Sequence, residues 1–77
     1  MDCLALFFTH SGAIKYKRIL SKEDIPCELM PVPRRLSSNC GICAKFTIDN
    51  FEAYINEDIE KIYELSNGVC NLVYDNE

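Results

Sequence analysis

The chain of 77 residues has no excess of basic residues, few glycines and prolines, and no long hydrophobic run. Eight Lys and Arg against twelve Asp and Glu give a net charge of −4, which argues against a large nucleic-acid or membrane-surface footprint. The apolar run at residues 3–8 is too short for a membrane span or for the core of a signal peptide. We therefore expect a cytoplasmic protein that binds neither nucleic acid nor membrane.

The sequence also lacks the even set of cysteines that a disulfide framework requires. Five cysteines without a secretory context favour free thiols in a reducing compartment. A zinc site needs four ligands, whereas Cys40, Cys43 and His10 supply three and no second CxxC pair is present. We predict no metal and no other cofactor, with a zinc site shared between two subunits as the less favoured alternative.

Hydrophobic periodicity predicts six secondary-structure elements in a single domain over residues 1–77. Apolar runs or alternation predict strands at 3–9, 27–33, 43–48 and 69–74. Helical spacing predicts helices over 11–24 and 50–66, the first with Thr9 or Ser11 as its N-cap. Asn67-Gly68 is predicted to form the left-handed C-cap of the second helix. The tail at 75–77 is expected to fray.

The order β-α-β-β-α-β is typical of a ferredoxin-like α+β sandwich. It predicts a four-stranded antiparallel sheet in the order 4-1-3-2, with both helices on one face and the other face open for a homodimer contact. Because strand–helix–strand crossovers are right-handed, the end of the first strand and the loop between strands two and three lie at the same edge of the sheet. We therefore expect residues 9–12 to lie beside residues 34–43.

Residues 31–43 form a connector between two apolar, periodic segments. This connector is rich in residue types that can react or bind an anion. The connector holds two cysteines, two arginines, two serines, an asparagine and a glycine. A thiol reacts as the thiolate, which guanidinium charge and hydrogen-bond donors favour. The composition therefore predicts a reactive-thiol site or an anion site, whereas the alternative is a linker with two solvated arginines and a buried Cys43.

The predicted anion site combines a guanidinium with hydroxyl and backbone donors. A helix start and arginine side chains are both suited to binding phosphate or carboxylate. The residues assigned to it are Arg34, Ser37, Ser38, Gly41 and Ser11. His10, at the turn before the helix, is interpreted as a surface or capping residue, and core packing is expected for Cys3, Cys27 and Cys70.

Over roughly residues 4–65 the chain resembles the putative Se/S carrier protein-like family of small bacterial domains. The resemblance rests on Phe8-Thr9-His10-Ser11-Gly12-Ala13, on Asp24-Ile25-Pro26, and above all on Pro31-Val32-Pro33-Arg34, Ser37-Ser38 and Cys40-Gly41. The chain departs from the family in the first helical turn, where Ser11-Gly12 replaces the family's His-Asp. The family label implies a cysteine that carries sulfur or selenium, which maps to Cys40, and its motif favours a role for Arg34 over Arg35.

The leading hypothesis is a carrier that holds a persulfide or selenide on Cys40, with Cys43 resolving or releasing the load. A donor or acceptor enzyme of sulfur or selenium metabolism would be its partner. The alternative is a regulatory or interaction module that binds a small anion without catalysis, because such folds often bind anions at sheet edges. A carrier needs at least one fast-reacting thiol, whereas a binding module needs none.

Overall fold

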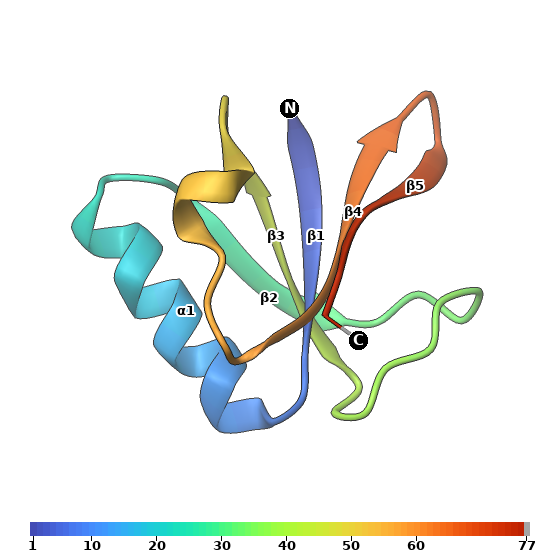
Figure 1. The fold of residues 1–77 in the computed structure, drawn as a ribbon, viewed down its shortest axis with the longest axis horizontal. Coiled ribbons are helices and arrows are strands. Elements are labelled where there is room, and N and C mark those ends of the chain that lie inside the picture. Colours follow the sequence, from blue (N-terminus) through green and yellow to red (C-terminus); the bar gives the residue numbers. More distant parts are fainter. Residues whose placement is uncertain (77) are drawn as a thin grey trace.

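The computed structural model describes residues 1–76 and shows an α+β fold with one long helix on one face of a five-stranded antiparallel sheet (Figure 1). The sheet has the order β2-β3-β1-β4-β5. The elements are β1 (Asp2–Phe7), α1 (His10–Lys22), β2 (Cys27–Pro31), β3 (Ile42–Thr47), the 3₁₀ helix η1 (Phe51–Tyr54), β4 (Ile59–Ser66) and β5 (Val69–Asp75).

The first half of the chain folds as its periodicity predicts. β1 pairs with β3 on one side and with β4 on the other, and its residues 3–7 are all buried. The continuous apolar run is therefore a central strand covered on both faces. α1 carries the chain across this face to β2, which runs parallel to β1 with β3 between them.

α1 begins and packs as its sequence indicates. The Thr9 side chain accepts a hydrogen bond of 3.0 Å from the Gly12 N–H and so caps the first turn. Tyr16 lies between Phe7 and Phe46, with ring centroids 5.3 and 5.6 Å apart. These tilted aromatic pairs form the centre of the core between α1 and the sheet.

The predicted helix over 50–66 is wrong, because most of this segment forms η1 and β4. Opposite β1, Lys61 pairs with Leu6 and Ile59 pairs with Phe7, so Glu60 is the extra residue of a β-bulge. The bulge lets Ile59 and Ile62 face the same side of the sheet although they are three residues apart. Residues three apart also share one face of a helix, which is why the same apolar pattern fits a helix in the sequence.

Asn67-Gly68 forms a hairpin turn and not a helix C-cap. Both residues have positive φ, 52° and 75°, and Ser66 pairs directly with Val69 across them. These are the features of a two-residue type I′ turn, for which Asn-Gly is the preferred sequence. The dipeptide supplies positive φ in either setting, which is why it also fitted a helix end.

The hairpin changes the sheet from the predicted 4-1-3-2 order. β4 takes the place beside β1 that was expected for the last strand, and β5 lies at the edge. Asp75 ends β5, and the Asn76 N–H donates to the Glu60 carbonyl at 2.9 Å. Of the tail expected to fray, Glu77 lies outside the described residues.

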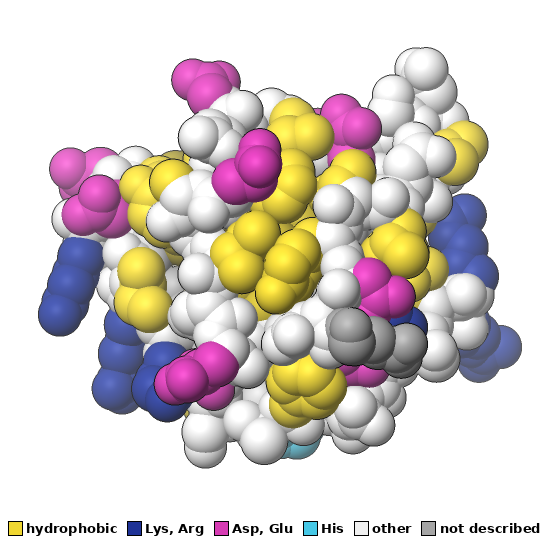
Figure 2. All heavy atoms as spheres, viewed as in Figure 1, with side chains coloured by type: hydrophobic (Ala, Val, Ile, Leu, Met, Phe, Trp, Pro, Cys, Tyr) yellow, Lys and Arg dark blue, Asp and Glu magenta, His cyan; other side chains and the backbone are white. Residues whose placement is uncertain are grey.

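Without a second helix, the face that carries α1 is only partly covered by secondary structure. Figure 2 shows hydrophobic side chains reaching the surface in the middle of this face. The partly buried side chains packed against the core there are Ile48, Phe51, Tyr54, Ile55, Val73 and Tyr74. On the opposite face, expected to be open, Val32 and Leu36 of the connector pack against Leu4, Leu6 and Cys43.

No helix within residues 1–76 is long and apolar enough to cross a membrane.

The hairpin can be tested at its turn. Gly68→Ala is expected to lower the free energy of unfolding by about 1–2 kcal/mol, because a side chain disfavours the left-handed conformation that Gly68 adopts. A Cβ there has nothing within 4 Å, so strain and not collision would account for the loss. Asn67→Gly is the matched control and should be close to neutral. Urea denaturation measures both, and equal stabilities for Gly68→Ala and the parent chain would contradict the turn.

Candidate functional site

The connector between β2 and β3 is a closed loop whose two ends are hydrogen-bonded to each other. The Val32 N–H donates to the Gly41 carbonyl at 3.0 Å. Gly41 has a φ of 75°, which turns the chain back into β3. Inside the loop, the Leu36 N–H donates to the Pro33 carbonyl at 2.9 Å, so Arg34 and Arg35 occupy the tip of a tight turn.

Cys40 is the half-buried thiol of this loop. Its Sγ donates to the Ile42 carbonyl at 3.3 Å and packs against the core cluster on the α1 side of the sheet. Its N–H donates to Ser38 Oγ at 3.4 Å. Ser38 and Ile42 each lie two positions from Cys40, so the local chain already restricts where the sulfur points.

The start of α1 contacts the Cys40 peptide directly. His10 Nε2 lies 2.6 Å from the Cys40 carbonyl oxygen, although the two residues are 30 positions apart. The prediction that the first helical turn lies beside this loop is confirmed by that contact, which is made by His10 and not by Ser11. β4 adds a second tie, because the Asn39 N–H donates to Glu60 Oε1 at 3.3 Å.

The two arginines at the turn differ in what they contact. Arg34 is exposed, and no ion pair of either arginine is found within residues 1–76. Arg35 donates from its guanidinium to the Gly68 carbonyl at 3.3 Å and to Cys70 Sγ at 3.5 Å. No local pattern in the sequence indicates this Arg35 contact, because it depends on the hairpin turn at Asn67-Gly68.

The remaining cysteines are distinguished by burial. Cys3 and Cys43 are fully buried and Cys27 is half-buried, and burial raises the pKa of all three thiols. For Cys43 the pKa rises to about 11, because burial is reinforced by negative charge on Cys40 and Cys70. Cys43 packs on the face opposite α1, whereas Cys40 packs on the α1 face. The alternative of a buried Cys43 beside a more accessible Cys40 is the arrangement observed.

A comparison with protein-family models matches residues 2–65 to the family described as Putative Se/S carrier protein-like. The chain belongs to this family. The match ends at Leu65 within β4, so β5 and Cys70 lie outside it. Comparisons with curated proteins and with solved structures found no match.

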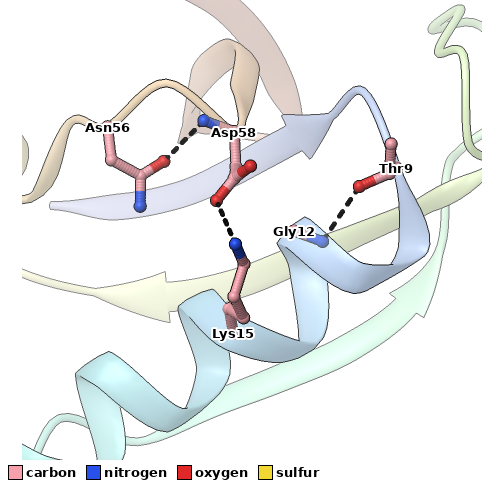
Figure 3. Close-up of polar contacts among 5 residues, drawn as sticks. All are labelled: Thr9, Gly12, Lys15, Asn56 and Asp58. Atoms are coloured by element: carbon pink, nitrogen blue, oxygen red, sulfur yellow. Dashed lines mark hydrogen bonds and ion pairs between the residues drawn. The ribbon is translucent and has the colours of Figure 1, made fainter.

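In this family member, a carboxylate already occupies the space beside the first turn of α1. Figure 3 shows Asp58 next to Gly12, with Lys15 reaching toward its carboxylate at 3.4 Å. The Asp58 N–H donates to Asn56 Oδ1 at 2.9 Å, and the Phe8 N–H donates to the Asp58 carbonyl at 3.2 Å. A carboxylate at a helix N-terminus is stabilised by the helix dipole. An anion bound at this turn would therefore face negative charge.

Most of the residues predicted to bind an anion are exposed. Ser37, Gly41 and Ser11 are exposed. Ser38 is half-buried, and its Oγ accepts a hydrogen bond from the Cys40 N–H. Their role in binding an anion stays a prediction. Within the described chain, no group of three or more His, Cys, Asp or Glu side chains is placed to hold a metal ion.

Two hollows on the surface of residues 1–76 lie away from Cys40. One of about 340 Å³ lies at the edge of β2 and β3, lined by Pro26, Cys27, Glu28, Lys45, Phe46 and Thr47. Another of about 380 Å³ lies below η1, lined by Ile25, Thr47, Ile48, Asp49, Asn50, Ala53 and Tyr54. Neither hollow contains a residue of the connector. Neither therefore gives Cys40 the concave, enclosed surroundings in which small molecules are usually bound.

The close approach of Asp58 to α1 gives a test by mutation. A Cβ at Gly12 would lie 2.9 Å from the Asp58 Cβ, so Gly12→Ala is expected to destabilise the fold by about 1–3 kcal/mol despite the better helix propensity of alanine. Asp58→Gly removes the colliding atom. A double-mutant cycle by urea denaturation should therefore give a favourable coupling between the two substitutions, and simple additivity would contradict the packing.

The buried thiols predict a loss of stability in alkali. Burial raises the pKa of Cys43 from its ordinary value of 9.0 to about 11, so its contribution to the free energy of unfolding is complete below pH 9 and is lost as the pH rises through about 11. Cys3 and Cys27 shift in the same direction. Urea denaturation under reducing conditions at pH 8 and pH 10.5 should show the loss, and Cys43→Ala should make it smaller. An unchanged pH dependence in that variant would contradict the assignment.

Proposed function

We propose that the chain carries sulfur or selenium on Cys40, as a covalent persulfide or selenide. The observation that supports this most directly is the position of Cys40 as a half-buried thiol in a closed loop, held to α1 by the His10 contact. Membership of a family described as carrier-like agrees with it. The Cys40-Gly41 element lies within the matched residues.

Burial favours Cys40 over most of the other thiols. A cysteine reacts as the thiolate, which burial disfavours, and Cys3, Cys27 and Cys43 all have raised pKa values for that reason. Cys70 is half-buried as well, but it lies outside the segment matched by the family. Cys40 is thus the thiol that meets both conditions, access and place in the family.

The loading step is a transfer between two thiols that needs no external oxidant or reductant. The Cys40 thiolate attacks the outer sulfur of a persulfide on a donor, and a new bond forms between the Cys40 sulfur and that outer sulfur. The bond between the two donor sulfurs breaks, and the donor leaves as a thiolate. An acceptor thiolate then attacks the outer sulfur on Cys40 in the same way, which returns Cys40 to its thiolate. A selenium atom in the outer position follows the same course.

The surroundings of Cys40 favour a protein as the source and destination of the load. The connector is exposed over much of its length, and neither hollow described above includes it. A donor or acceptor enzyme of sulfur or selenium metabolism, in the cytoplasm, is the partner we propose. Arg34 and the donors at Ser37, Ser38 and Gly41 would stabilise the anionic chalcogen.

A resolving role for Cys43 requires the connector to open. Cys43 is fully buried, its thiol donates to the Pro31 carbonyl at 3.8 Å, and its pKa of about 11 keeps it protonated near neutral pH. In the closed loop we therefore assign release of the load to an acceptor thiol of the partner.

The carrier function is tested by loading the thiol and mapping the product. After incubation with glutathione persulfide, peptide mass spectrometry should find one added sulfur on the peptide that contains Cys40. Cys40→Ala should abolish that product, whereas Cys70→Ala, the control at another half-buried thiol, should retain it. Iodoacetamide mapping of the unloaded protein should label Cys40 before Cys3, Cys27 and Cys43. Uniform slow labelling of all five thiols would instead favour a small-anion-binding module.

A further inference from the structure

The Cys40 peptide is held from both of its ends. On the amino side its N–H donates to Ser38 Oγ, and on the carboxyl side its carbonyl oxygen contacts His10 Nε2 at 2.6 Å. The Ser38 contact is local to the connector. The His10 contact joins Cys40 to α1, an element 30 positions away in the sequence.

The chemistry of the contact fixes where a proton must lie. A carbonyl oxygen only accepts hydrogen bonds, so His10 Nε2 has to carry the hydrogen. Both the neutral imidazole protonated at Nε2 and the imidazolium cation meet this requirement. The contact therefore does not need His10 to be charged.

We propose that His10 is a positioning residue for Cys40, which holds the loop so that the thiol stays turned toward the Ile42 carbonyl and against the core. This inference rests on the proposed carrier role of Cys40. Two observations support it: the Cys40 Sγ donates to the Ile42 oxygen at 3.3 Å, and it packs against the α1-side core cluster. A thiol held this way has its sulfur turned toward a backbone acceptor and partly shielded from reagents. Loss of the His10 contact exposes it.

His10 can be replaced without removing the other supports of the helix. Its side chain is exposed, and α1 is capped by Thr9 and not by His10. The second tie from outside the connector, between Glu60 Oε1 and the Asn39 N–H, stays in place when His10 is changed. An effect confined to Cys40 can thus be separated from a general loss of structure.

The test compares His10→Ala with His10→Gln, whose side-chain amide offers an N–H donor at similar reach. The rate of Cys40 alkylation by iodoacetamide at pH 7.5, divided by that of Cys70 in the same sample, should rise about two- to tenfold in His10→Ala, as expected for the loss of one hydrogen bond. His10→Gln should restore a ratio near that of the parent chain. Ile14→Ala, at an exposed position one turn further along α1, is the matched control and should leave the ratio unchanged. A His10→Ala ratio equal to that of Ile14→Ala, or lower than that of the parent, overturns the proposal.

A second measurement reads the contact without using thiol reactivity. Long-range ¹H–¹⁵N correlation spectra of the imidazole above pH 8 should show His10 protonated at Nε2, and the Nδ1–H tautomer would overturn the proposal. Neither measurement requires Cys40 to carry sulfur. If both succeed while Cys40 fails to accept a persulfide, the carrier function fails and the positioning role of His10 stands.

Discussion

β1 is buried on both faces, and this burial determines where α1 and the connector must pack. Residues 3–7 are covered by α1 on one side and by the connector side chains Val32 and Leu36 on the other. A strand with two apolar faces needs a cover on each, and its position between β3 and β4 supplies hydrogen bonds along both edges. The right-handed path from β1 through α1 to β2 then brings the connector to the end of the sheet where α1 begins.

A hairpin of β4 and β5 follows η1, and within residues 1–76 no second long helix covers the α1 face of the sheet. One bulge at Glu60 aligns Ile59 and Ile62 on the core side, and another register shift in β4–β5 leaves Val73 as an extra residue. Bulges bend strands and increase their twist, so the hairpin curves against the rest of the sheet. Arg35 joins the connector to the turn of this hairpin through the Gly68 carbonyl. The loop and the added strand are therefore parts of one surface.

Three of the five thiols have a raised pKa, and burial causes the shift more than neighbouring charge does. Cys3, Cys27 and Cys43 are held in the core or at its margin, where the protonated form is favoured. Cys40 and Cys43 are three residues apart, but the alternation of β3 and the turn at Gly41 send their side chains to opposite sides of the sheet. A C-x-x-C spacing thus does not by itself make a dithiol pair. The surrounding strand decides whether the second cysteine is reactive.

The sequence alone predicted the central strand, a helix capped by Thr9 or Ser11, the edge strand beside β3 and the connector with its cysteines and arginines. Each of these depends on local features, namely apolar runs, a capping side chain and turn residues. It did not determine the segment from 50 to 66, because a bulged strand can carry apolar residues at helical spacing and Asn-Gly serves both a helix end and a hairpin turn. The contacts His10–Cys40 and Arg35–Cys70 span 30 and 35 residues and follow no local pattern. These pairs depend on which strands are neighbours and which faces are buried, so they are known from the folded chain and not from its local patterns.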